Sequence, residues 1–154
     1  MLYFAYGSNM DHGQMKERCP SARFFGAAKL PDHRLAFSRK SSARCCGVAD
    51  AVPSEGDAVW GGVFEIEDGD LEELDRREGY RPGRGANSYW RREREVLLGG
   101  DENRPLAVWT YFAEREENPP RPSQAYKDQI LAGARQCRLP EDHIRGLERI
   151  EVGG

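Results

Sequence analysis

The order of strand-like and helix-like segments restricts the fold of this chain more than any other feature of its sequence. Segments rich in β-forming residues lie at 2–6, 22–30, 33–39, 47–52, 59–66, 89–98 and 106–113. Helical periodicity is found at 10–18, 68–78, 123–138 and 140–149. Because strands and helices do not alternate, the order favours an α+β fold with a mixed, closed or barrel-like sheet and a few flanking helices. No repeat or shift in composition divides the chain, so we predict a single domain over residues 1–154.

Turn-forming residues set the predicted ends of these segments. Pro31-Asp32 and the Pro53–Asp57 stretch are expected to be turns between strands. Asn9 or Asp11 could cap the helix predicted over 10–18. In the segment 89–98, charged residues at every second position predict one face exposed to water.

Composition and charge limit the partners of the chain. The 154 residues are 38% hydrophobic and 32% charged, which is typical of a globular protein. A net charge of −3 gives no reason to expect nucleic acid or a membrane as a partner. No run of about 20 apolar residues and no basic signal sequence are present, so we expect a cytoplasmic protein.

The four cysteines form no CxxC pair, which favours reduced thiols over a disulfide framework or a zinc site. The carboxylates of the chain likewise show no metal-ligand spacing, and we expect no metal.

The first string that could carry chemistry is the N-terminal Phe4-Ala5-Tyr6-Gly7-Ser8-Asn9. A strand that ends in Gly-Ser-Asn exposes successive backbone N–H groups, and a helix that starts just after it adds positive potential. Such a loop suits a carboxylate or a developing oxyanion. An ordinary turn would use the same residues, so the string alone leaves both interpretations open.

The second string is the helix that ends at Glu78. Leu71, Leu74 and Glu78 share one helical face, so the leucines carry Glu78 inward. Burial and the negative end of the helix dipole both raise the pKa of such a carboxyl group, as a general acid–base requires. A Glu78 exposed to water, or paired with an arginine, is the alternative.

Taken together, these strings resemble the γ-glutamylcyclotransferases and their relatives. The resemblance covers nearly the whole chain and also includes Val59–Phe64, Trp109-Thr110-Tyr111, Pro122–Tyr126 and Gly133-Ala134. It implies a small α+β domain around a barrel-like sheet, and no metal or organic cofactor. It further implies that Glu78 is catalytic and that the glutamyl group is bound by Phe4, Ala5, Tyr6, Gly7, Ser8, Asn9 and Tyr126.

The implied reaction uses the geometry of the substrate itself. The free α-amine of a γ-glutamyl group attacks its own γ-carbonyl, and 5-oxoproline and a free amine are released. The expected partner is a small γ-glutamyl molecule, and the protein is expected to be a monomer or a homodimer. Two alternatives stay open: an enzyme acting on a γ-glutamyl amine or a γ-glutamyl-acylated biosynthetic intermediate, and a non-catalytic module that binds a γ-glutamyl metabolite.

One segment departs from the family pattern. The stretch from Arg81 to Ser88 is longer than in compact members and holds Arg81 and Arg84. Loops of this kind often cover sites. We therefore expect Arg81 or Arg84 to contact the leaving-group side of the substrate, with a solvated loop as the alternative.

Overall fold

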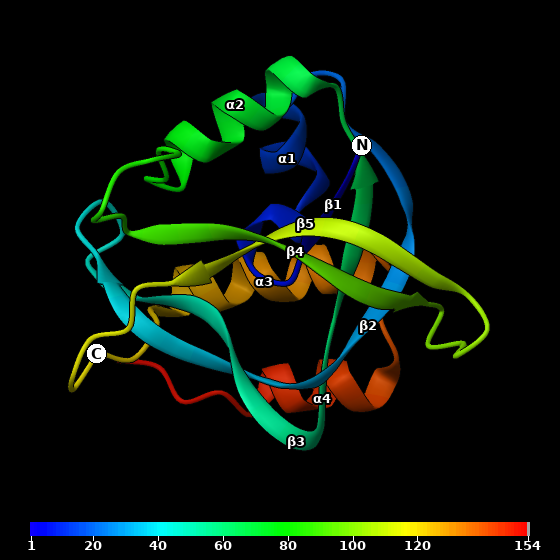
Figure 1. Cartoon of the computed structure of the whole chain (residues 1–154). Helices are drawn as coiled ribbons and strands as arrows, with labels where there is room; N and C mark the ends of the chain where they lie inside the picture. Colours follow the sequence, from blue (N-terminus) through cyan, green and yellow to red (C-terminus); the bar gives the residue numbers. More distant parts are fainter. Residues whose placement is uncertain (154) are drawn as a thin grey trace.

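The computed structural model describes residues 1–153 and is built around a closed five-stranded barrel (Figure 1). The strands are β1 (Leu2–Ala5), β2 (Arg23–Ser41), β3 (Cys46–Glu65), β4 (Tyr89–Leu98) and β5 (Pro105–Ala113). They close in the order β1-β3-β2-β4-β5. The β1–β5 pair is parallel and the others are antiparallel, so the predicted mixed, barrel-like sheet is confirmed.

The helices flank this barrel, as Figure 1 shows. They are η1 (Ser8–Met10, a 3₁₀ turn), α1 (His12–Arg18), α2 (Asp68–Arg77), α3 (Gln124–Gln136) and α4 (Glu141–Glu148). Asp11 caps α1 by accepting a hydrogen bond from the Gly13 N–H at 3.1 Å. Gly79 ends α2 with a φ of +70°, as its position in the sequence predicted. No helix within residues 1–153 is long and apolar enough to cross a bilayer.

The prediction of separate strands at 22–30 and 33–39, and at 47–52 and 59–66, was wrong. Each pair is one long strand, and β2 and β3 form a single bent hairpin. The turn-forming residues mark the bend, because the register shifts between Pro31 and His33 and Asp32 has a φ of +59°. The Asp32 carboxylate accepts from the Gly56 N–H at 3.1 Å, which ties the bends of the two strands together. Proline and glycine here kink paired strands and do not end them.

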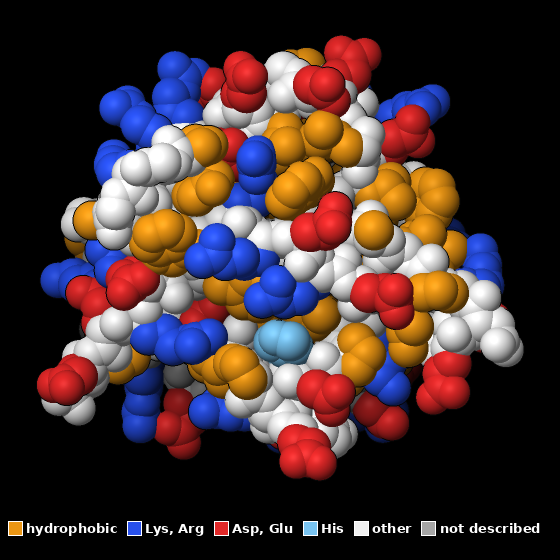
Figure 2. Space-filling view, viewed as in Figure 1, with side chains coloured by type: hydrophobic (Ala, Val, Ile, Leu, Met, Phe, Trp, Pro, Cys, Tyr) orange, Lys and Arg blue, Asp and Glu red, His pale blue; other side chains and the backbone are white. Residues whose placement is uncertain are grey.

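The face of β4 also differs from its prediction. The exposed residues run without a break from Arg92 to Glu95, whereas Arg91 turns inward and pairs with Asp75 of α2 at 2.8 Å. Arg94 keeps its charge in water while its guanidinium lies over the Phe112 ring, 4.9 Å from the centroid. In Figure 2, Lys and Arg side chains accordingly form a band across the middle of this face.

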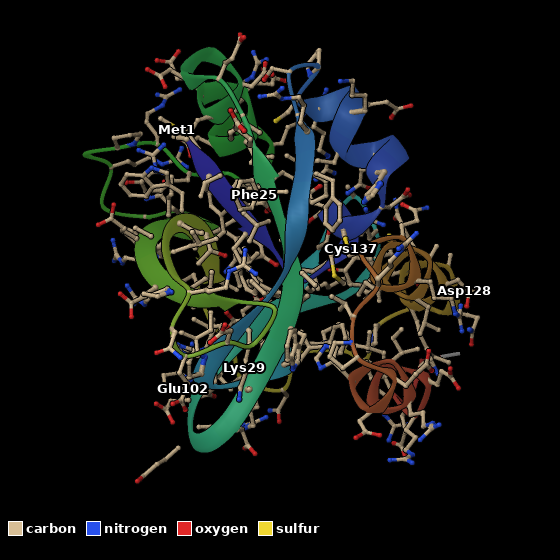
Figure 3. The ribbon with its side chains drawn as sticks, turned by 90° about the vertical axis from the view of Figure 1, so that its right-hand side faces the viewer. Met1, Phe25, Lys29, Glu102, Asp128 and Cys137 are labelled. Carbon is tan, nitrogen blue, oxygen red and sulfur yellow. The ribbon has the colours of Figure 1, made fainter. Side chains whose placement is uncertain are left out.

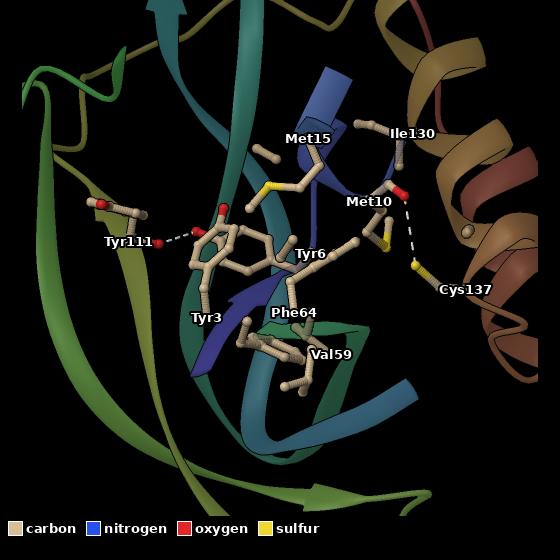
Figure 4. Packing of buried hydrophobic residues seen from close by; sticks show 14 of the residues in the cluster. Tyr3, Tyr6, Met10, Met15, Val59, Phe64, Tyr111, Ile130 and Cys137 are labelled. Carbon is tan, nitrogen blue, oxygen red and sulfur yellow. Dashed lines mark hydrogen bonds between the residues drawn. The ribbon is translucent and has the colours of Figure 1, made fainter. Parts of the chain in front are cut away.

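The core fills the barrel and continues under α3. Phe4, Leu30, Val59 and Val63 are buried in its interior, and Figure 4 shows the aromatic rings that pack beside them. Cys137 lies where the end of α3 meets the barrel (Figure 3), and its thiol contacts the Met10 carbonyl oxygen at 3.6 Å. The four cysteines are free thiols, and three of them are buried.

Helix α3 packs closely against the turn that carries the first motif. A Cβ atom at Gly133 would lie 2.4 Å from the backbone nitrogen of Asp11 and 2.5 Å from the carbonyl carbon of Met10. Only glycine allows this approach without a shift of the backbone. Helix α3 therefore holds the turn η1 in place.

Candidate functional site

A pocket of about 410 Å³ opens where η1, the end of α2 and the end of the β2–β3 hairpin meet. Six of the predicted site residues line it: Tyr6, Gly7, Ser8, Asn9, Glu78 and Tyr126. The predicted Phe4 and Ala5 do not. Both are buried in the barrel wall, where Phe4 accepts a hydrogen bond from the Thr110 hydroxyl at 2.9 Å through its carbonyl oxygen. Phe4 and Ala5 therefore support the loop at residues 6–9 from the barrel side.

The loop at residues 6–9 lines this pocket. The N–H groups of Met10 and Asp11 close the 3₁₀ turn on the carbonyls of Gly7 and Ser8, at 3.1 and 3.0 Å. Within residues 1–153, the N–H groups of Gly7 and Ser8 have no acceptor. Gly7 and Ser8 lie at the start of the turn η1, and α1 begins at His12, two residues later than the helix predicted over 10–18.

Glu78 follows directly after α2 and points into the pocket. Leu71 and Leu74 face the core as predicted, and the Glu78 side chain is 18% exposed. Its carboxylate lies 3.3 Å from the Asn9 amide nitrogen and 3.9 Å from the Arg18 guanidinium. Burial raises the pKa of Glu78, and the charge of Arg18, the hydrogen bond from Asn9 and the charge of Arg44 oppose this rise. The net shift is upward, which suits a group that gives and takes a proton near neutral pH.

Asn9 connects Glu78 to the rest of the pocket. Its amide nitrogen donates to the Tyr3 hydroxyl at 3.0 Å as well as to Glu78. Its amide oxygen accepts from Gln14 at 2.7 Å and from Arg18 at 2.9 Å. These two donors fix the orientation of the amide, so the nitrogen must face the Glu78 carboxylate. Asn9 thereby orients Glu78.

Tyr126 lines the pocket from the first turn of α3. Its hydroxyl accepts from the Ala49 N–H at 2.9 Å, and burial raises its pKa to about 12, so the phenol is neutral at physiological pH. The guanidinium of Arg44, at the end of the β2–β3 hairpin, lies over its ring at 4.6 Å. Ser123 caps α3 on the Tyr126 N–H at 3.1 Å, which sets the position of Tyr126 in the first turn.

A scan of protein families gives one match that covers most of the chain. Residues 3–128 match the family described as "Gamma-glutamyl cyclotransferase, AIG2-like". Curated γ-glutamylcyclotransferases from Homo sapiens and Mus musculus are each 34% identical to this chain, over 97% of it and 78% of their own length. The chain belongs to this family.

Solved structures agree with the assignment. A γ-glutamyl cyclotransferase superimposes with a TM-score of 0.89 at 33% identity, over 99% of this chain and 89% of that chain. A Homo sapiens protein described as uncharacterized superimposes with a TM-score of 0.88 at 34% identity, over 99% and 88%. This family member is therefore a γ-glutamyl cyclotransferase-type enzyme.

The surroundings of Ser8 give this cyclotransferase no means to activate a serine nucleophile. The Ser8 hydroxyl oxygen accepts from Gln14 at 2.8 Å and from Arg44 at 3.4 Å. Both neighbours are donors, and no histidine lies among the residues that line the pocket. A serine is activated by a base that removes its proton, and neither an amide nor a guanidinium does this. Ser8 thus fits the binding loop better than a covalent role.

Sequence reasoning missed Gln14, Arg18 and Arg44, whose side chains bind Ser8 or Asn9 of the loop. Gln14 and Arg18 lie on α1, one and two turns beyond Asn9, so their helical spacing was a usable signal. Arg44 gave no such signal, because only the pairing of β2 with β3 brings its hairpin end to residue 8.

The loop at 81–88 lies mostly outside the pocket. Ser88 lines the pocket, but Arg81 and Arg84 do not. Arg84 donates to the Asn87 side-chain oxygen at 2.9 Å and to the Gly79 carbonyl at 3.0 Å, and it borders a neighbouring hollow with Trp90 and Glu114. Neither arginine lines the pocket, and the contact with the leaving group stays a prediction.

Within residues 1–153, no group of three or more His, Cys, Asp or Glu side chains could hold a metal ion. Asp50 is fully buried and accepts hydrogen bonds from Ser38, Arg115 and the Ala113 N–H at 2.8 to 3.0 Å. Its oxygens serve the fold.

Proposed function

We propose that this enzyme converts a small γ-glutamyl compound to 5-oxoproline and a free amine, with Glu78 as its acid–base residue. One observation carries the proposal: a mostly buried carboxylate of raised pKa lines the same pocket as Gly7 and Ser8, whose backbone N–H groups have no acceptor within residues 1–153. Cyclisation of a γ-glutamyl group requires one group to move a proton and another to stabilise an oxyanion.

The steps follow from this geometry. Glu78 takes a proton from the α-ammonium group, and the free amine attacks the γ-carbonyl carbon. The carbonyl oxygen becomes an oxyanion and accepts from the N–H groups of Gly7 and Ser8, each worth about 2.7–4 kcal/mol in known oxyanion sites. Glu78 then delivers its proton to the departing nitrogen, the carbonyl re-forms and the bond from that nitrogen to the γ-carbon breaks. The ring nitrogen passes its extra proton to the released amine, so a neutral lactam and an ammonium product remain. Holding the substrate in its folded conformation lowers the activation barrier, by up to about 7–11 kcal/mol in well-oriented intramolecular reactions.

The remaining residues bind and orient the substrate. Tyr6, Asn9 and Tyr126 surround the glutamyl group, and Phe4 and Ala5 support the loop from the barrel side. The Tyr6 hydroxyl donates to the Tyr111 carbonyl, as Figure 4 shows, which leaves its ring as a fixed wall. No cofactor takes part in these steps. We keep the cytoplasm as the proposed location.

A panel of γ-glutamyl compounds, assayed for 5-oxoproline by chromatography, tests the proposal. We expect 5-oxoproline and the free amine in equal amounts from at least one compound. A protein that binds these compounds and releases no 5-oxoproline would be a binding module, which the Glu78 geometry argues against.

A further inference from the structure

The mouth of the pocket is formed by the end of the β2–β3 hairpin. Arg39, Lys40 and Arg44 line the pocket from this hairpin, and we call these three residues the basic rim. Ser42 and Ala43 between them are exposed, whereas Tyr3, Tyr6, Asn9 and Tyr126 are buried, and Arg44 lies over the last of these. The pocket therefore has a buried end and an end that faces solvent.

Arg44 is fixed in this rim by neutral partners. It donates to the Gln129 side-chain oxygen at 3.1 Å and to the Gln14 side-chain oxygen at 3.0 Å. A third contact reaches the Ser8 hydroxyl at 3.4 Å, and the guanidinium lies over the Tyr126 ring. A guanidinium has five N–H donors, so two are left for a ligand.

The Glu116 carboxylate lies at the rim, where it accepts from the Lys40 backbone N–H at 2.7 Å, but it pairs with none of the three side-chain charges. Within residues 1–153, no carboxylate forms an ion pair with Arg39, Lys40 or Arg44. The other cations at the pocket differ: Arg76 and Arg77 pair with Glu73, and Arg18 lies near Glu78. Three unpaired cations at one edge, in a chain of net charge −3, attract an anion to that edge.

We propose that the basic rim binds the anionic part of the leaving amine, with Arg44 as the fixed contact, so that the enzyme prefers γ-glutamyl derivatives of acidic amino acids. The proposal rests on the proposed function, which puts the glutamyl group at the buried end beside Gly7, Ser8 and Glu78. The leaving amine then extends toward the rim. One carboxylate of the leaving amine binds Arg44, which loses little conformational freedom on binding because its side chain is already held. A second carboxylate is attracted by the positive charges of Arg39 and Lys40.

Three substrates that differ in negative charge on the leaving part test the preference. These are γ-glutamyl-ethylamide, γ-glutamyl-alanine and γ-glutamyl-aspartate, with none, one and two carboxylates on the leaving part. We expect kcat/KM for 5-oxoproline release to rise along the series, and the differences to shrink as salt is added. Equal kcat/KM for all three contradicts the rim proposal alone. Absence of 5-oxoproline from all three contradicts the proposed function, and the rim proposal with it.

Arg44→Gln separates a contact with the leaving group from a structural role. We expect KM for γ-glutamyl-alanine and γ-glutamyl-aspartate to rise by roughly 10- to 100-fold more than KM for the ethylamide, which corresponds to the loss of one charge-assisted hydrogen bond. Arg44→Lys keeps the charge and should recover part of the difference. Arg81→Gln removes the same charge from a residue outside the pocket, and KM for each of the three substrates should stay that of the wild type. A uniform loss in Arg44→Gln, over all substrates, would show that Arg44 only holds Ser8 and Gln14 and would overturn the proposal.

Discussion

The two ends of the pocket are built in opposite ways. At the buried end, both polar atoms of the Asn9 side chain have protein partners, and Glu78 has both Asn9 and Arg18 beside it. At the basic rim, three cations lack a carboxylate within residues 1–153. Groups that perform a reaction need a fixed geometry, whereas groups that select a substrate need free charge and free donors. The buried end is therefore suited to catalysis, and the basic rim is suited to the selection of the leaving amine.

Glu78→Gln gives the sharpest test of the buried end. The amide keeps the shape of the side chain but carries no proton to transfer, so kcat should fall by roughly 10²–10⁴ for every substrate. Release of 5-oxoproline under saturating substrate measures this. The variant should unfold cooperatively like the wild type, which excludes a folding defect. Activity within a few-fold of the wild type would remove Glu78 from its role.

Gly133→Ala tests whether α3 holds the buried end in place. The added methyl group would lie about where Met10 and Asp11 already are, so the backbone of the turn must move. Overpacking of this kind costs about 1–3 kcal/mol of unfolding free energy, measured by urea denaturation. Gly146→Ala on α4 is the matched control, because a Cβ there meets nothing within 4 Å, and it should leave stability unchanged or raise it. Equal stability of the two variants would contradict the close contact.

The sequence predicted the elements better than their long-range contacts. The helical spacing from Leu71 to Glu78 and the Gly-Ser-Asn turn are local signals. The functional residues that they predicted, Glu78 and the turn residues, line the pocket. The bend at Pro31 was predicted as a turn because the same residues, a proline followed by a turn-forming residue, occur both in kinked strands and in true turns. Arg91 was misread because its partner, Asp75, is on another element.

The site shows the same limit. Asn9 was predicted to bind substrate, but its contact with Glu78 joins residues 69 positions apart, which no local pattern encodes. The single domain, the absence of nucleic-acid partners and the oligomeric state stay predictions.

The pH dependence of stability tests the electrostatics of Glu78. Because the pKa of Glu78 is higher in the folded protein than in the unfolded chain, the folded state binds more protons between the two values. Glu78 therefore lowers stability as pH rises through that range, and its charged form is a cost at neutral pH. We expect Glu78→Gln to be more stable than the wild type at pH 7, and the difference to shrink as pH falls to the ordinary pKa of a glutamate. Denaturant unfolding at several pH values measures both. A variant that is less stable at pH 7 would show that Arg18 and Asn9 outweigh burial.

Ser8→Ala is expected to have a smaller effect, because the proposed donors of the loop are backbone groups. The variant loses an acceptor for Gln14 and Arg44 but keeps the N–H groups of Gly7 and Ser8. The loss of one such hydrogen bond corresponds to about 0.5–1.5 kcal/mol, so kcat/KM should fall by no more than about tenfold. Kinetics on γ-glutamyl-alanine measure it. Complete loss of activity, with a trappable acyl-serine in the wild type, would establish covalent catalysis.

The smallest effect is expected from the loop at 81–88, which the sequence alone favoured as the anion site. Arg84 is already bound to Asn87 and Gly79, and neither Arg81 nor Arg84 lines the pocket. Replacing both with alanine removes two positive charges from the neighbourhood, and screened charges at the surface change affinity little. The KM for γ-glutamyl-aspartate should therefore change by less than about threefold, and the ratio of KM for γ-glutamyl-aspartate to KM for γ-glutamyl-ethylamide should stay that of the wild type. Arg44→Gln, measured beside it, should change that ratio strongly. A selective loss for γ-glutamyl-aspartate in the double variant, with none in Arg44→Gln, would move the anion site from the rim to this loop.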